Sequence, residues 1–139
     1  MSYYASGVKK PSVTRAVLDA SALLALLFKE PGAKLVVPHL PGSMLSAINL
    51  SEVVSKAVEN GLMLEDARRM LSEFPCQIVP FDVDAAYLTA SLRAATRPFG
   101  LSLGDRACLA LALSENVPAV TADQSWAKCD LGVKVIQIR

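Results

Sequence analysis

Four acidic residues lie where a sheet of parallel strands would gather them at one edge. Asp19 ends an apolar run, Glu52 and Asp105 lie near the starts of two predicted helices, and Asp123 follows a short apolar run. They are 33, 53 and 18 positions apart, so only folding brings them together. Converging carboxylates raise one another's pKa values unless a divalent cation neutralises them. Oxygen ligands with no cluster of His or Cys nearby favour Mg²⁺ or Mn²⁺, whose chemistry on phosphates and bound water favours phosphodiester hydrolysis.

Each of three acids also has a purely structural interpretation. Ser102-x-x-Asp105 resembles a capping box with Asp in place of Glu, and Asn49-x-x-Glu52 is similar. Asp123 can cap the turn that follows it. Acidic side chains are in any case favoured at helix N-termini by the helix dipole. A capping role therefore stays open for these three acids.

The remaining polar candidates are fewer. Asp19 ends an apolar strand and precedes Ser21, a setting that offers few structural roles for an acid. Arg106 places a cation in the first turn of a predicted helix, where it opposes the dipole, so it pairs with an acid, contacts phosphate or forms a plain surface pair. His39 is the only histidine and lies between prolines, which argues against Ser-His-Asp and Cys-His catalysis. Neither a Walker A nor a Gly-x-Gly-x-x-Gly sequence is present.

The composition predicts one folded domain. The chain has 139 residues, of which 53% are hydrophobic and 19% charged, and this excess of apolar residues favours a packed core and some apolar surface that faces a partner chain. The net charge of +1 excludes a polybasic nucleic-acid module. Three cysteines without metal-ligand spacing favour a reducing cytoplasm. The longest apolar stretch, residues 16–28, contains Asp19 and is too short to span a bilayer.

Strands and helices are predicted to alternate along the chain. Strands are expected at residues 15–19, 44–48, 77–81, 118–121 and 133–138. Helices are expected at residues 20–28, 32–40, 49–61, 64–74, 82–97 and 102–116, with Trp126 in a short helix or loop. This alternation predicts a parallel α/β sheet with right-handed crossovers, in which chemistry gathers at the carboxyl ends of the strands. Residues 1–14 have no sustained apolar period and are expected to form a loose, flexible extension, separate from a domain at residues 15–139.

Several segments resemble, in order, the motifs of the PIN-domain ribonucleases. These segments are residues 17–27, 46–53, 101–112 and 120–126, followed by a closing strand at 133–138. The likeness runs from about Arg15 to the C-terminus. The Ser-Leu-Gly-Asp-Arg sequence at 102–106 is similar to that of VapC toxins of prokaryotic toxin–antitoxin pairs. The resemblance implies a PIN-like three-layer sandwich, with a central, mostly parallel sheet flanked by helices.

The resemblance also implies an activity and partners. It implies an endoribonuclease that uses Mg²⁺ or Mn²⁺, with Asp19 and Asp105 as the principal metal ligands and Glu52 and Asp123 beside them. Ser21 would be a polar neighbour of Asp19. A cognate antitoxin would cover the site, and the toxin would commonly form a homodimer in a prokaryotic cytoplasm. Toxins of this kind begin close to the first strand, so residues 1–14 have no assigned role.

Other functions stay open to different degrees. A receiver-type signalling domain also gathers acids and Mg²⁺ at a sheet edge, but it should have paired acids after the first strand, where only Asp19 stands, and Lys134 falls inside a predicted strand. A catalytically idle binding module would not need all four acids. A PIN nuclease that acts in RNA processing without an antitoxin remains an alternative. Transfer, ribosomal and messenger RNA are all compatible substrates, bound by a local basic rim that includes Arg93, Arg97, Arg106 and Lys128.

Overall fold

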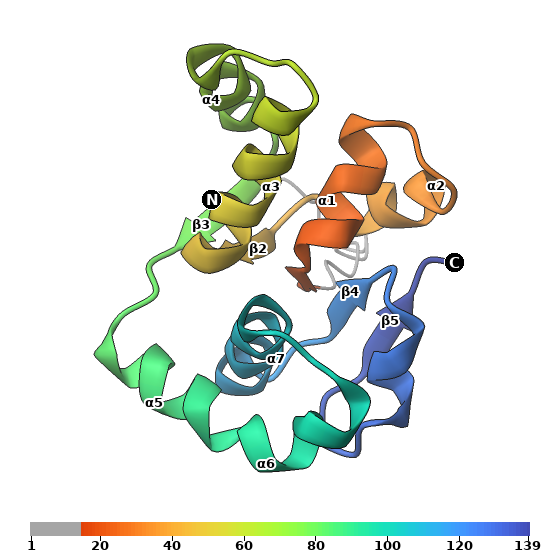
Figure 1. The fold of residues 1–139 in the computed structure, drawn as a ribbon. Coiled ribbons are helices and arrows are strands. Elements are labelled where there is room, and N and C mark those ends of the chain that lie inside the picture. The colour runs from red at the N-terminus through yellow and green to blue at the C-terminus, as the bar shows by residue number, and fades with distance from the viewer. Residues whose placement is uncertain (1–14) are drawn as a thin grey trace, which may run out of the picture.

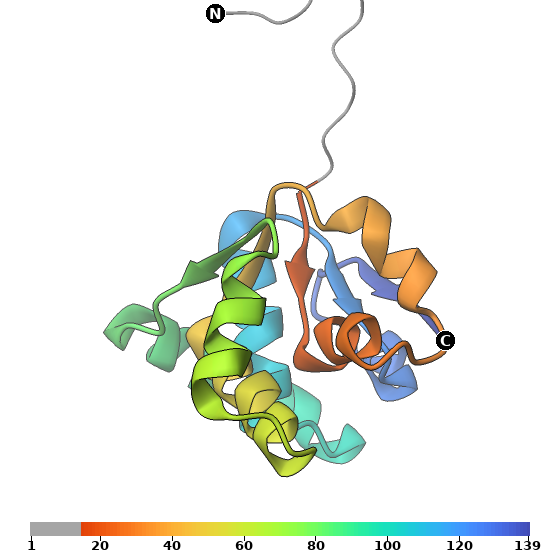
Figure 2. The same ribbon diagram turned by 90° about the horizontal axis from the view of Figure 1, so that it is seen from above.

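Five parallel strands form the central sheet of this protein. The computed structural model describes residues 15–139, so the predicted extension at residues 1–14 lies outside the described residues. The strands are β1 (Val17–Leu18), β2 (Ser43–Ser46), β3 (Cys76–Val79), β4 (Ala119–Thr121) and β5 (Val135–Gln137). Their order is β3-β2-β1-β4-β5, and every neighbouring pair is parallel. The carboxyl ends of the central strands β1 and β4 therefore lie side by side (Figure 2).

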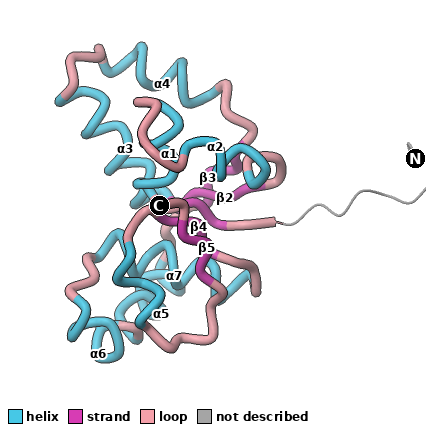
Figure 3. Tube along the Cα trace, turned by 90° about the vertical axis from the view of Figure 1, so that its right-hand side faces the viewer, coloured by secondary structure: helices cyan, strands magenta, loops and turns pink. Residues whose placement is uncertain are grey.

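Helices cover both faces of the sheet (Figures 1 and 3). One layer contains α1 (Ala20–Leu27), α2 (Ala33–Val36), α3 (Ala47–Glu59) and α4 (Leu64–Ser72); the other contains α5 (Val83–Ser91), α6 (Arg93–Thr96) and α7 (Leu103–Glu115). Three 3₁₀ turns, η1 (Val37–His39), η2 (Arg97–Phe99) and η3 (Gln124–Lys128), complete the chain. The predicted three-layer α/β sandwich is confirmed. Within residues 15–139, no helix has the length and apolar character needed to cross a membrane.

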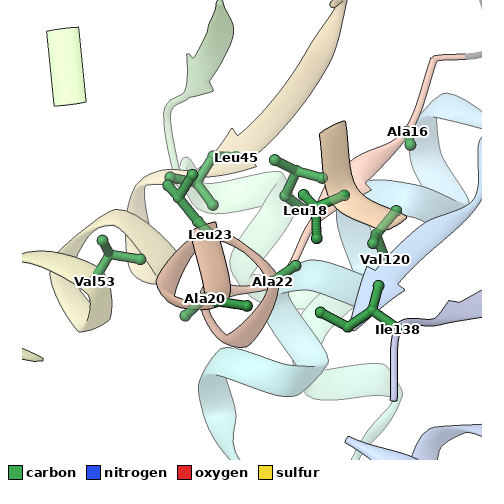
Figure 4. Packing of buried hydrophobic residues seen from close by; sticks show 11 residues of the cluster. Ala16, Leu18, Ala20, Ala22, Leu23, Leu45, Val53, Val120 and Ile138 are labelled. Atoms are coloured by element: carbon green, nitrogen blue, oxygen red, sulfur yellow. The ribbon is translucent and has the colours of Figure 1, made fainter. Parts of the chain in front are cut away.

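Successive side chains of a strand point in opposite directions, so the two residues of β1 enter the cores on the two faces of the sheet. Leu18 packs toward α1, against Ala22 and Leu23, in the core cluster shown in Figure 4. Val17 belongs to the opposite cluster, which the fully buried Trp126 also joins. These two cores fix β1 in place, and with it the acid that follows.

Helix α3 begins two residues earlier than predicted. Its N-cap is Ser46, whose Oγ accepts a hydrogen bond of 3.2 Å from the backbone N–H of Ile48. Because the helix begins at Ala47 rather than Asn49, Glu52 lies in its second turn and not in the first, as the sequence suggested. The Asn49-x-x-Glu52 sequence is therefore not a capping box.

The prediction of a single long helix at residues 82–97 is wrong, because the chain forms α5, α6 and η2 instead. The carbonyl of Thr89 accepts bonds from the backbone N–H of Leu92 (3.2 Å) and from Nη1 of Arg106 (3.2 Å). The hydroxyl of Thr96 donates to the carbonyl of Leu92 at 2.7 Å. The bond of Leu92 reaches three residues back instead of the four of a regular α-helix, and α5 ends at this point.

Gly32 occupies the turn between α1 and α2 with φ of 92°, a left-handed conformation that favours glycine. The space around it is also filled, since a Cβ there would overlap the carbonyl oxygen of Ile138, just beyond β5. Gly61 has a similar φ of 99°, but nothing lies within 4 Å of where its Cβ would be. Any side chain at Gly61 would thus meet backbone strain alone, whereas a side chain at Gly32 would meet both backbone strain and steric crowding.

Replacing Gly32 with Ala should destabilise the protein more than replacing Gly61 with Ala. The Gly61→Ala variant loses only the conformational advantage of glycine, about 1–2 kcal/mol. The Gly32→Ala variant should lose a further amount of about 1–3 kcal/mol, because Ile138 must move. Urea unfolding of both variants measures the difference, and equal losses would show that the Gly32 turn is not crowded.

Candidate active site

All four acids singled out in the sequence line one cleft, together with Ser21. The cleft has a volume of about 430 Å³ and is open to solvent beyond the carboxyl ends of the central strands. Asp19 follows β1, Glu52 projects from α3, Asp105 from the first turn of α7, and Asp123 follows β4. Folding therefore unites residues that are up to 104 positions apart in the sequence, from Asp19 to Asp123. Arg106 is not among the residues that line the cleft.

Asp19 is almost entirely buried, with 4% of its surface exposed. Its Oδ2 accepts hydrogen bonds from Oγ of Ser21 (2.7 Å) and from Oγ1 of Thr121 (3.0 Å). Each hydroxyl in turn accepts a backbone N–H, Ser21 from Ala122 (2.9 Å) and Thr121 from Asp123 (3.0 Å). Since a hydroxyl has one proton to donate, these backbone bonds orient both hydroxyls toward Asp19.

Glu52 reaches across from α3 to the start of α7. Its Oε1 accepts a bond of 2.8 Å from Nδ2 of Asn49. The carboxylate lies so close to Gly104 that a Cβ at that position would overlap it. Partial burial raises the pKa of Glu52, the hydrogen bond from Asn49 opposes this rise, and the charge of Asp105 adds to it.

Asp105 forms the capping box that its sequence context allowed. Its Oδ2 accepts the backbone N–H of Ser102 at 2.9 Å, and Oγ of Ser102 accepts the backbone N–H of Asp105 at 3.1 Å. Burial raises the pKa of Asp105, the bonds from Ser102 oppose the rise, the charge of Asp123 adds to it, and that of Arg106 lowers it.

Asp123 caps η3, as the sequence also allowed. Its Oδ1 accepts bonds from the backbone N–H (2.9 Å) and the hydroxyl (2.7 Å) of Ser125. Within residues 15–139, Arg106 does not form the ion pair with an acid that was one of its expected contacts, and its guanidinium donates to the carbonyl of Thr89 on α5. Its expected contact with RNA phosphate stays a prediction.

One oxygen of each carboxylate is anchored, while the other has no hydrogen-bond partner among residues 15–139. The anchored atoms are Oδ2 of Asp19, Oε1 of Glu52, Oδ2 of Asp105 and Oδ1 of Asp123. The second oxygen of each acid remains available to a ligand in the cleft. Capping and ligand binding are therefore compatible roles for the same side chain.

The cleft carries more negative charge than the protein neutralises. The pKa of Asp19 is raised to about 6, mainly by burial and also by the charges of Asp105 and Glu52, while the hydrogen bonds from Ser21 and Thr121 oppose the rise. Lys56 also lines the cleft, but its ammonium pairs with Glu59 at 3.4 Å. A bound cation would relieve this repulsion.

The donor set fits a hydrated magnesium ion. All four acidic side chains offer oxygen ligands, which Mg²⁺ and Mn²⁺ prefer. Within residues 15–139, no three His, Cys, Asp or Glu side chains form a group that could hold a metal by themselves. Mg²⁺ commonly binds through one or two carboxylates and keeps several waters, so it does not require a closed protein cage.

Three residues of the site were not anticipated from the sequence. Thr121 ends β4, so the same carboxyl-end rule that identified the acids could have found it. Asn49 was noted only as a capping candidate, and Gly104 only as part of a motif. Their contacts with Glu52 depend on how α3 crosses α7, which no local pattern encodes.

In the presence of EDTA, lowering the pH from 7 to 5 should stabilise the wild type more than an Asp19→Asn variant. Asp19 takes up its proton near pH 6 when folded but near 3.8 when unfolded, so its ionised form destabilises the fold. This shift corresponds to about 3 kcal/mol, present above pH 6 and lost as the pH falls toward 3.8. Urea unfolding at pH 7, 6 and 5 should show about 1 kcal/mol of this change, because the rest appears only below pH 5. Identical pH dependence in the two proteins would contradict the raised pKa.

Several solved structures similar to this one are toxins or toxin–antitoxin complexes. A toxin–antitoxin complex from Klebsiella pneumoniae has a TM-score of 0.70 at 24% identity and covers 89% of this chain and 98% of that one. DNA-bound VapBC from Salmonella typhimurium gives 0.71 at 19%, with coverages of 91% and 99%. A sarcin–ricin-loop-cleaving VapC toxin from Mycobacterium tuberculosis gives 0.68 at 15%, with coverages of 86% and 98%. At these identities the likeness shows the fold alone.

No curated protein matches the sequence. The profile of the PIN domain, in contrast, matches residues 16–131. That range covers most of the chain and includes all four acids of the cleft. This chain therefore belongs to the PIN domain family.

Proposed function

We propose that this protein is a metal-dependent endoribonuclease and the toxin of a type II toxin–antitoxin pair. The observation that carries the proposal is the cleft that four carboxylates line, each with one oxygen that has no hydrogen-bond partner among residues 15–139. Membership of the PIN domain family supports nuclease chemistry. The similar solved structures, a sarcin–ricin-loop-cleaving toxin and toxin–antitoxin complexes among them, support the biological setting.

Asp19 and Asp105 would be the principal ligands of the ion, through Oδ1 in both cases, because Oδ2 of each is already bonded. Asp123 would complete the oxygen surroundings through Oδ2, and Glu52 would lie beside the ion with its Oε2 free to accept a proton. A bound Mg²⁺ or Mn²⁺ would supply charge to polarise the scissile phosphate and to lower the pKa of a water. Ser21 and Thr121 would hold the Asp19 carboxylate in one orientation.

A carboxylate of the cleft would act as the general base, and Glu52 is better suited to this role than Asp123. The residue reaches solvent, while partial burial of its carboxyl group raises the pKa and makes Glu52 a better proton acceptor near neutral pH. Water would attack the phosphorus in line with the 3′ oxygen, and Glu52 would accept its proton. The P–O3′ bond would break, and the 3′ oxygen would take a proton from solvent. The products would be a 5′-phosphate and a 3′-hydroxyl.

RNA binding would rely on a local basic rim, because the net charge of the chain is only +1. Arg93 in α6, Arg97 in η2 and Lys128 in η3 are exposed. The turns η2 and η3 pack against each other, and they adjoin Asp105 and Asp123 in the sequence. Cations at these positions would contact phosphates that flank the scissile bond.

An antitoxin would cover the cleft from a neighbouring apolar groove between α3 and α4. The groove has a volume of about 800 Å³ and shares Ser51 and Ser55 with the acidic cleft. Its apolar lining consists of Ala47, Leu50, Val54, Val58, Leu64, Leu71 and Ile78. One partner segment could thus place apolar side chains in the groove and a basic residue among the acids. Arg fits best, since its guanidinium binds carboxylates in a bidentate manner.

A homodimer is part of the same proposal. Val83 and Tyr87 lie one turn apart on α5 and are 71% and 75% exposed, which is unusual for large apolar side chains. A second copy of the chain would cover them.

The three free cysteines agree with a reducing cytoplasm, which we propose as the location. The division into an extension at residues 1–14 and a PIN domain at 15–139 stays a prediction.

The Asp105→Asn variant should lose RNA cleavage while the Ser102→Ala variant keeps it. Asn at position 105 can still accept the N–H of Ser102 but lacks the charge that binds metal, so we expect cleavage to fall by about 100-fold or more. Ser102→Ala should cost about 1 kcal/mol of stability through the lost cap. Cleavage of labelled RNA in Mg²⁺ measures activity.

Melting with EDTA or Mg²⁺ provides the control. At ten times its Kd, Mg²⁺ should stabilise the wild type and Ser102→Ala by about 1.4 kcal/mol, and Asp105→Asn much less. Wild-type cleavage by folded Asp105→Asn protein would refute the assignment of Asp105.

Expression of this protein without an antitoxin should stop bacterial growth, and Asp19→Asn should restore growth at equal protein abundance. The reason is that uncontrolled RNA cleavage depends on the charge of Asp19. Growth curves and immunoblots measure both quantities. If the purified protein cleaves RNA but its expression leaves growth unaffected, the RNA-processing alternative replaces the toxin proposal.

A further inference from the structure

Asn49 joins α3 to the start of α7 directly beneath the cleft. It is fully buried, with 0% of its surface exposed. Its Nδ2 donates to Oε1 of Glu52 at 2.8 Å and to the carbonyl of Gly104 at 3.0 Å. An amide nitrogen has two protons, so both are used. One side chain thus links the carboxylate of Glu52 to the backbone next to Asp105.

The other end of the Asn49 side chain has no partner. Its Oδ1 is buried and accepts no hydrogen bond within residues 15–139. Rotating the amide by 180° would place Oδ1 against two other acceptors, so the contacts fix its orientation. A buried acceptor without a partner destabilises the fold, and an apolar side chain would avoid this cost. The amide at this position thus carries the cost of one unpaired atom, while its other polar atom holds Glu52 and the start of α7 together.

Gly104 gives an independent sign of the same requirement. Glycine inside a helix is less stable than alanine, and Gly104 has no left-handed backbone to require it. A Cβ at this position would, however, overlap Oε1 of Glu52 and crowd the rest of its carboxyl group. The missing side chain of Gly104 thus creates the space in which the Glu52 carboxylate lies.

We propose that Asn49 and Gly104 are positioning residues that hold Glu52 at the start of α7, so that its Oε2 stays available to the metal site. A glutamate side chain at an exposed position otherwise samples many rotamers, and ordering it costs entropy. The bond from Asn49 and the space at Gly104 restrict it to one arrangement beside Asp105. This inference rests on the proposed metal-dependent nuclease function.

An Asn49→Leu variant tests the inference, because Leu has a similar volume and no polar atoms. Its stability in EDTA should stay close to that of the wild type, because removal of the unpartnered oxygen offsets the loss of the two bonds from Nδ2. Its affinity for Mn²⁺, measured by electron paramagnetic resonance, should fall by about 10-fold, within the range seen when a residue that orients a metal ligand is lost. RNA cleavage should fall in parallel.

A double-mutant cycle shows whether Asn49 acts through Glu52. In a Glu52→Gln background, Asn49→Leu should cause no further loss of Mn²⁺ affinity. Gly104→Ala is a second variant, which tests the inference even if the Asn49→Leu protein does not fold. It should also weaken Mn²⁺ binding by about 10-fold, although alanine favours the helix.

Two results would overturn the inference while leaving the proposed function intact. In the first, the wild type binds Mn²⁺ and cleaves RNA, and the Asn49→Leu variant is less stable but binds Mn²⁺ equally well. The second is an equal effect of Asn49→Leu with and without Glu52. A wild type that neither binds Mn²⁺ nor cleaves RNA would instead overturn the proposed function, and this inference with it.

Discussion

Burial of carboxylates, together with the repulsion among them, is the constraint around which the cleft is arranged. Each acid is held against this repulsion by uncharged donors: hydroxyls for Asp19, an amide for Glu52, a backbone N–H for Asp105, and the N–H and hydroxyl of Ser125 for Asp123. Such donors stabilise the ionised form without cancelling its charge. The cleft consequently keeps both its geometry and its negative potential, which are the two properties that a divalent cation requires.

Structural and chemical roles are combined in the same side chains. The capping box of Asp105 and the turn at Asp123 are the arrangements that the purely structural interpretation predicts, and both are confirmed. For Asp105, the cap uses Oδ2 and leaves Oδ1 toward a ligand. A carboxylate has two oxygens, so a helix start that is stabilised by an acid is also a place where that acid is held rigidly.

The sequence predicted more of the fold than of the detailed site. Apolar runs that end in acids, such as the one before Asp19, gave the parallel sheet and the edge at which the acids meet. The start of α3 at Ala47 and the break at Leu92 were not predicted, because the cap at Ser46 and the tighter backbone bond of Leu92 show only in the folded chain. The pairing of Asn49 with Gly104 spans 55 positions and depends on the crossing of α3 and α7, which local sequence does not specify.

In each acid of the cleft, one oxygen accepts structural hydrogen bonds and the other has no partner among residues 15–139, and this arrangement has an evolutionary consequence. Changing Asp105 or Asp123 to Asn keeps a carbonyl oxygen that can accept the same backbone bond, so the folded state survives while the charge disappears. Asp and Asn codons differ by one nucleotide. A population under pressure to escape the activity proposed for this chain can therefore silence it in a single step, without accumulating misfolded protein. Intact function then has to be maintained by continued selection, because stability alone does not protect these positions.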